Sequence, residues 1–332
     1  RNMNTTDPLT HHTLTQDEEF FLTKTLLQTN SIIKMSCSIF MYLVTNYING
    51  MLVFTYFKHP MFYENPRYVL FIHMVFNDIF EMSVALVLHI WLEIAPFMGV
   101  PICYFFLILA ITTTLNTPLN LAVMALERYV AICNPLRHAQ ICTLRRTYMA
   151  IAVIWFIGLI PGTSDLFIVF AVEPLSFFKT SVYCIRENFF RSPAQVYKRM
   201  YIKTFYFTVV WLVIVFTYLR IVYAARSASM SEKSSAKKAR NTILLHGIQL
   251  MLSMLTFIAP FTEYIFWMLP SSWLLDLHYV RFFLVYILPR TLSPVIYGMR
   301  DENFRKHFTG YQLCSSAKVK PSKEVVTISY KD

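Results

Sequence analysis

Seven stretches of mostly apolar residues alternate along the chain with short polar or charged segments. They cover roughly residues 31–57, 68–92, 102–126, 147–170, 200–225, 242–269 and 278–299. Each has at least about the 20 residues that a helix needs to cross the hydrocarbon core of a bilayer. Outer-membrane β-strands would show apolar and polar residues alternating with period two, and the chain does not show this alternation. The pattern therefore predicts an all-α membrane protein, a seven-transmembrane helix bundle over residues 31–299.

Lysine and arginine concentrate in alternate connecting segments, on the same side of the membrane as the C-terminus. These segments contain Lys58 and Arg67, then Arg137, Arg145 and Arg146, then residues 226–240 and the tail after residue 299. Because short basic loops stay on the cytoplasmic side, the N-terminus is expected outside and the C-terminus inside. Residues 1–30 are then an extracellular segment, in which Asn4 begins a glycosylation sequon. Residues 300–332 form a cytoplasmic tail that starts with a short amphipathic helix.

Composition supports a membrane protein and excludes several function classes. Hydrophobic residues make up 56% of the 332 residues and charged residues only 15%, whereas soluble chains contain roughly a quarter charged residues. The formal net charge of +11 lies on one side of a membrane, so it does not indicate nucleic-acid binding. The chain contains no H-E-x-x-H, G-x-G-x-x-G or P-loop motif. We therefore expect neither an enzyme nor an organic cofactor.

Two of the six cysteines are placed to form a disulfide. Cys103 opens the third span at its outer end, and Cys184 lies in the long outer segment before the fifth span. Both face the oxidising side, so a bond tying that segment to the helix is expected. Cys314, in the tail beyond a short basic stretch, is a candidate for palmitoylation, with an ordinary free thiol as the alternative.

The inner end of the third span carries a longer motif. Residues 124–138 read MALERYVAICNPLRH, and further matches lie at Asn49-Gly50, Asp78, Trp155, Thr217-Tyr218, residues 238–246 and residues 289–297. This set resembles the signature of vertebrate odorant receptors of the fish-type branch, within the rhodopsin-like G-protein-coupled receptors. Three positions depart from the pattern: Glu127 replaces an aspartate, Arg240 a phenylalanine, and Ser293 the asparagine or aspartate before Pro294.

The resemblance implies a function and a location. The expected receptor binds a small-molecule odorant between the outer halves of its helices and activates a cytoplasmic heterotrimeric G protein of the stimulatory type, raising cAMP. It is expected in the plasma membrane of olfactory sensory neurons, in cilia or microvilli. An alternative is a rhodopsin-like receptor for an internal lipid or metabolite. A seven-span transporter is a distant third, because no internal repeat is found.

A polar cluster inside the membrane is the first candidate site. Asp78 is an ionisable residue in the middle of a span, where charge is costly and usually has a partner or a role. With Asn49, Thr117 and Ser293 it is expected to hold water or a sodium ion between helices and to change partners on activation. The alternative is a protonated, hydrogen-bonded packing residue.

The second candidate site is the G-protein switch at the cytoplasmic end. Arg128 is expected to pair with Glu127 at rest and to move to a carbonyl or to Tyr218 when the helices part, which is a two-state element. The resemblance adds Tyr129 and Tyr297 to this set. The alternative is an arginine that only snorkels to the interface.

The third candidate site is the ligand pocket between the outer halves of the helices. The candidate residues are Thr113, Thr114, Lys203, Glu263 and Arg281. Lys203 and Arg281 are suited to anchor a carboxylate or sulfate, and Glu263 an ammonium, in an otherwise apolar pocket. Snorkelling of Lys203, or a Lys203–Glu263 ion pair, is the alternative.

Overall fold

The computed structural model describes residues 8–95, 97–184, 193–229, 251, 280 and 283–300. Its long helices are α1 (Pro8–Lys58), α3 (Pro66–Ile94), α4 (Val100–Cys133), α6 (Leu144–Val172) and α8 (Pro193–Ser229). The short elements are α2 (Pro60–Tyr63), α5 (Pro135–Ile141), a 3₁₀ turn (Phe177–Lys179) and the strands β1 (Phe97–Gly99) and β2 (Ser181–Tyr183). A π-helical turn, Phe283–Ile287, leads into α11 (Leu288–Arg300).

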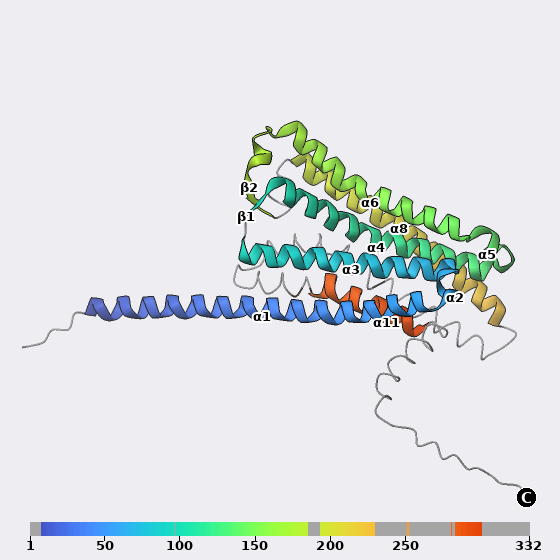
Figure 1. Ribbon diagram of the computed structural model, residues 1–332, viewed down its shortest axis with the longest axis horizontal. Helices are drawn as coiled ribbons and strands as arrows, with labels where there is room; N and C mark the ends of the chain where they lie inside the picture. The colour runs from blue at the N-terminus through green and yellow to red at the C-terminus, as the bar shows by residue number, and fades with distance from the viewer. Residues whose placement is uncertain are drawn as a thin grey trace, which may run out of the picture.

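The long helices lie side by side, as Figure 1 shows, with β1 and β2 at one end of the bundle and α2 and α5 at the other. We call these the disulfide end and the α5 end. The central helix is α4, which packs against α3, α6 and α8, while α1 packs against α3 and α11. Large apolar side chains such as Phe156 and Phe205 remain exposed on the outer faces. Such a surface suits lipid and not water.

The predicted spans agree with the described helices. Within the described part of the chain, five segments are long and apolar enough to cross a membrane: Ile32–Lys58, Pro66–Leu92, Val100–Cys133, Leu144–Val172 and Tyr197–Ala224. They correspond to the first five predicted spans. The sixth, 242–269, lies outside the described residues apart from residue 251, and the seventh is described continuously only from residue 283.

The first helix is longer than the hydrophobic pattern predicted. The helix α1 begins at Pro8 and not near residue 31, and Figure 1 shows it extending past the disulfide end of the bundle. Residues 9–30 contain no glycine or proline, so nothing in the backbone interrupts the helix. Proline at a first helical position costs nothing, because its missing N–H would be unpaired there anyway. Hydropathy detects the buried or lipid-facing part of a helix and not the polar turns that precede it.

Two glycines on α6 allow it to approach α4 closely. A methyl group added at Gly158 would overlap the side-chain amide of Asn116, and one added at Gly162 would lie 3.4 Å from Ile108. Asn116 is fully buried. With its amide nitrogen facing the carbonyls, it donates to the backbone oxygens of Thr112 (3.2 Å) and Ile154 (3.3 Å). Small residues at such contacts are typical of helix pairs in membranes.

We expect Gly158→Ala to lower the midpoint of thermal unfolding of the purified protein, because Asn116 must move out of its hydrogen bonds. Overpacking of this kind costs about 1–3 kcal/mol. Gly50→Ala on α1 is the matched control, since no atom lies within 4 Å of its added methyl group and alanine has the higher helix propensity. Equal midpoints for the two variants would show that the α4–α6 contact tolerates a larger residue.

Candidate functional site

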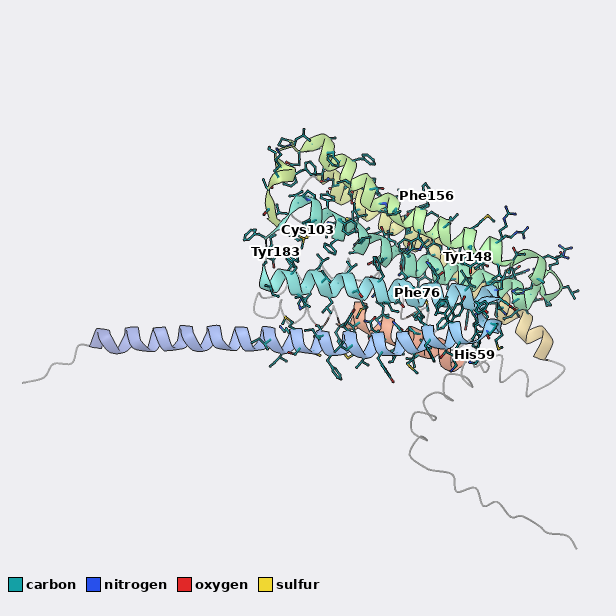
Figure 2. The ribbon with its side chains drawn as sticks, in the orientation of Figure 1. His59, Phe76, Cys103, Tyr148, Phe156 and Tyr183 are labelled. Carbon is teal, nitrogen blue, oxygen red and sulfur yellow. A yellow bond between two sulfur atoms is a disulfide. The ribbon has the colours of Figure 1, made fainter. Side chains whose placement is uncertain are left out.

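The disulfide end is held by the predicted bond between Cys103 and Cys184, which is present in the structure. Strand β1 pairs antiparallel with β2, and Val100 N–H donates to the carbonyl of Thr180 at 3.1 Å. Both cysteines are buried, in an apolar cluster that includes Met98. Figure 2 shows Cys103 and Tyr183 together at this end and His59 at the opposite end. The segment before α8 is thereby fixed to the first turn of α4.

A charged pair lies between α6 and α8. Lys198 Nζ donates to Asp165 Oδ1 at 2.6 Å, and the Asp165 side chain is only 6% exposed. Lys198 was not among the predicted residues, and its position one turn into α8 depends on where that helix starts. Lys203 follows on α8 and is half-buried. Glu263 and Arg281 lie outside the described residues, so the predicted Lys203–Glu263 alternative stays a prediction.

The threonines predicted for the pocket contact α3, since the Thr113 carbonyl accepts a hydrogen bond from Asn77 Nδ2 at 2.9 Å and Thr114 binds a carboxylate of that helix. Thr113 is fully buried, and its hydroxyl donates to the carbonyls of Leu109 (2.9 Å) and Ala110 (3.2 Å) in its own helix. The Thr114 hydroxyl donates to Glu81 Oε1 at 2.6 Å. The structure therefore places both residues in the α3–α4 interface, and contact with a ligand stays a prediction for them.

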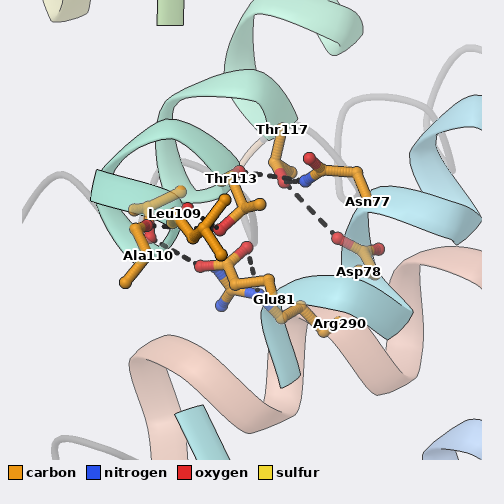
Figure 3. Close-up of polar contacts among 9 residues, drawn as sticks. Asn77, Asp78, Glu81, Leu109, Ala110, Thr113, Thr117 and Arg290 are labelled. Atoms are coloured by element: carbon orange, nitrogen blue, oxygen red, sulfur yellow. Dashed lines mark hydrogen bonds and ion pairs between the residues drawn. The ribbon is translucent and has the colours of Figure 1, made fainter. Parts of the chain in front are cut away.

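The intramembrane polar cluster contains three of its predicted members among the described side chains. Thr117 Oγ1 donates to Asp78 Oδ1 at 3.4 Å and accepts from Asn77 Nδ2 at 3.0 Å (Figure 3). Asn49 is buried, and neither polar atom of its side chain has a hydrogen-bond partner in the described part of the chain. The side chain of Ser293 lies outside the described residues. Asp78 and Thr117 are thus brought together, and Asn77 is an additional member.

An ion pair that was not predicted lies next to this cluster. Arg290 of α11 donates through Nε to Glu81 Oε2 at 3.0 Å and through Nη2 to Glu81 Oε1. Both side chains are almost fully buried. Each is a charged residue within a predicted span, the same signal that singled out Asp78. Hydropathy alone did not indicate that the two would meet.

A histidine joins three helices nearby. Trp155 Nε1 of α6 donates to His73 Nε2 at 2.9 Å, and His73 Nδ1 lies 3.1 Å from Asn120 Oδ1 on α4. Because an indole N–H only donates, Nε2 must accept, so His73 is neutral and its Nδ1 proton goes to Asn120. The amide nitrogen of Asn120 donates to the carbonyl of Leu70 at 3.0 Å. This network fixes α3, α4 and α6 relative to one another.

At the α5 end the predicted switch residues Glu127 and Arg128 are buried, and Glu127 contacts a residue of α5. Glu127 Oε1 lies 2.9 Å from His138 Nε2 of α5, and Glu127 and Arg128 are 7% and 8% exposed. The contact with His138 was not predicted, and the pairing of Glu127 with Arg128 stays a prediction.

The tyrosines of the predicted switch are arranged around this end. The Tyr129 ring packs against Phe216 of α8, with 5.7 Å between ring centroids. Tyr218 is 38% exposed. Tyr297 belongs to α11, and its side chain is outside the described residues. The movement of Arg128 toward Tyr218 is a property of a second state and stays a prediction.

Glu127 also acts on a cysteine in the loop after α5. Burial, and then the Glu127 carboxylate, raise the pKa of the Cys142 thiol, while Arg146 acts in the opposite direction. Glu127→Gln removes a negative charge that disfavours the thiolate. We expect the pKa of Cys142 to fall in this variant, so that maleimide labels Cys142 faster near pH 8 than in the wild type. Labelling followed by peptide mass spectrometry measures this rate in the variant and in the wild type.

Two modification sites and the tail remain predictions. Asn4, Cys314 and the short amphipathic helix after the seventh span lie outside the described residues.

The arrangement defines a class of protein. Apolar helices pack around α4, a disulfide closes one end of the bundle, and a Glu-Arg-Tyr triplet with buried Glu127 and Arg128 lies at the other, as in a multi-pass membrane receptor. Residues 48–297 match the family described as 7 transmembrane receptor (rhodopsin family). The chain belongs to this family, which confirms the predicted seven-transmembrane fold class.

Relatives within this family support the odorant-receptor resemblance. Odorant receptor 131-2 of Danio rerio is 30% identical over 310 residues, covering 92% of this chain and 94% of the relative. Olfactory receptor 4K15 of Homo sapiens is 30% identical over 217 residues, covering 62% and 61%. Neuromedin-U receptor 1 of Homo sapiens is 22% identical over 301 residues, covering 78% and 68%. The resemblance first seen in the motifs therefore extends along most of the chain.

Proposed function

We propose that this protein is an odorant receptor, which binds a small molecule between the helices near the disulfide end and activates a heterotrimeric G protein at the α5 end. The similarity to the Danio rerio odorant receptor over almost the full length of both chains carries this proposal. The proposal includes a stimulatory G protein that raises cAMP and a place in the surface membrane of olfactory sensory neurons.

Two features of the bundle support this orientation. Disulfides persist on the oxidising side of a membrane, so the end with Cys103–Cys184 faces outward and the N-terminus is outside. The opposite end presents exposed Arg137, Arg145 and Arg146, as expected for cytoplasmic loops. A ligand and a G protein therefore bind at opposite ends of α4.

The test is a cAMP assay of cells expressing the receptor against amino acids, bile acids, steroids, prostaglandins and amines. A response to at least one class, absent from cells without the receptor, supports the proposal. A cAMP response together with expression confined to tissues other than the olfactory epithelium would favour the alternative of a receptor for an internal lipid or metabolite.

Lys203 is proposed to select anionic ligands. Its ammonium lies on the disulfide-end half of α8, where a charge-assisted hydrogen bond to a carboxylate or sulfate is worth about 1.5–3 kcal/mol, or ten- to a hundredfold in potency. We expect Lys203→Met to shift the concentration–response curve to the right by this factor for anionic agonists and to leave neutral agonists unchanged. Lys179→Met, at an exposed position of the loop, is the control. An unchanged curve for an anionic agonist would show that Lys203 only snorkels.

A further inference from the structure

The polar core of the bundle contains two carboxylates one helical turn apart. Asp78 and Glu81 lie on α3 and are 1% and 5% exposed. Residues separated by three positions share one face of a helix. Two buried carboxylates at this spacing repel each other, and they remain ionised only if a cation lies beside them.

The protein supplies that cation from α11. Arg290 is 3% exposed and binds Glu81 through two N–H groups, one of them at 3.0 Å. Figure 3 shows Arg290 reaching Glu81, with Asp78 on the neighbouring turn of α3. A guanidinium is charged at every accessible pH, and its fork matches both oxygens of a carboxylate. The charge is therefore permanent and its position is fixed by the helix.

The remaining oxygens of the cluster are mostly occupied by protein donors. Glu81 Oε1 also accepts from the Thr114 hydroxyl at 2.6 Å. The Thr117 hydroxyl donates to Asp78 and accepts from Asn77. A hard metal cation needs about six oxygen ligands. Among the described residues, the second oxygen of Asp78, the amide oxygen of Asn77 and the buried amide of Asn49 are what is left, and these few oxygens do not fit a sodium ion.

We propose that Arg290 is the resident cation of the Asp78–Glu81 cluster and takes the place of the sodium ion, which the sequence analysis gave beside water as the occupant of this site. The link from α11 to α3 and α4 then consists of side chains alone, through Arg290, Glu81 and Thr114. The stability of this receptor is accordingly independent of Na⁺.

Thermal unfolding of the purified full-length protein tests this without an agonist, so its outcome does not depend on the proposed function. The comparison is between NaCl and choline chloride, each at about 150 mM to keep screening equal. We expect the wild-type midpoints to agree to within about 1 °C, because a salt ion that does not bind does not stabilise. Arg290→Gln leaves the carboxylates without their cation, so its midpoint should be at least about 3 °C higher in NaCl than in choline chloride.

Arg145→Gln, which removes an exposed arginine on α6, controls for the loss of a positive charge and should respond equally to both salts. A saturable rise of the wild-type midpoint in NaCl would overturn the proposal. An Arg290→Gln protein that folds but does not distinguish the salts would overturn it as well. If that variant does not fold, the comparison of the wild type in the two salts decides alone, since a sodium ion bound to the cluster would raise its midpoint in NaCl.

Discussion

Arg128→Ala is expected to abolish agonist-driven cAMP production while leaving most of the receptor at the cell surface. Arg128 is 8% exposed at the α5 end of α4, next to the Glu127 that pairs with His138. Buried apolar residues of α4, such as Leu121 and Met124, hold the helix in the bundle, so loss of the guanidinium should affect the switch more than the fold. We expect at least about a hundredfold loss of signalling. This corresponds to the loss of about 3 kcal/mol by which Arg128 stabilises the active state relative to the resting state.

The measurement pairs a cAMP assay with surface immunolabelling of the same cells. Arg137→Ala is the matched control, because Arg137 is an exposed arginine of the neighbouring α5 and should signal normally. A normal cAMP response of Arg128→Ala at wild-type surface levels would mean that Arg128 only snorkels to the interface.

Loss of the disulfide should reduce signalling as strongly as Arg128→Ala. The cause is different, because the receptor is retained inside the cell and its contact with the G protein is not altered directly. The bond joins residues 81 positions apart, and closing a loop of this kind stabilises a protein by roughly 2–4 kcal/mol. We expect Cys103→Ser and Cys184→Ser each to cause intracellular retention and loss of response, because both side chains are buried and each variant also leaves a free thiol in an apolar cluster.

Cys37→Ser, at an exposed cysteine of α1, is the control and should reach the surface normally. Mass spectrometry of unreduced peptides from the wild type should show Cys103 and Cys184 in one linked species. Free alkylation of both thiols without prior reduction would contradict the assignment.

Most of the architecture could be predicted because it depends on local pattern. A span is recognised from about 20 apolar residues in a row, which requires no knowledge of neighbouring helices. The five apolar segments found among the described residues agree with the predicted ones, and the Cys103–Cys184 bond followed from the side of the membrane on which both residues lie. The polar start of α1 was not predicted as helix, because it has no lipid-facing stripe to detect.

The partners of the polar residues were harder to predict. Glu81 and Arg290 are 209 positions apart, and whether they meet depends on the rotation of α3 and α11 about their own axes. The same holds for Lys198 with Asp165, which depends on where α8 begins. The pairing of Glu127 with His138 depends on the path of the short helix α5.

The sequence by itself determined the class of the protein, the number of its spans and the residues that carry charge into the membrane. Apolar length and short motifs establish these, since each is a property of neighbouring residues in the chain. Only the tertiary structure decided that Glu81 faces Arg290, that His138 faces Glu127 and that Thr114 contacts a carboxylate on α3. A rotation of one helix by a single residue, about 100°, would point these side chains elsewhere without altering any hydropathy pattern. The packing of α3 against α4, and of α11 against α1, holds the helices at rotations in which the buried charges are paired.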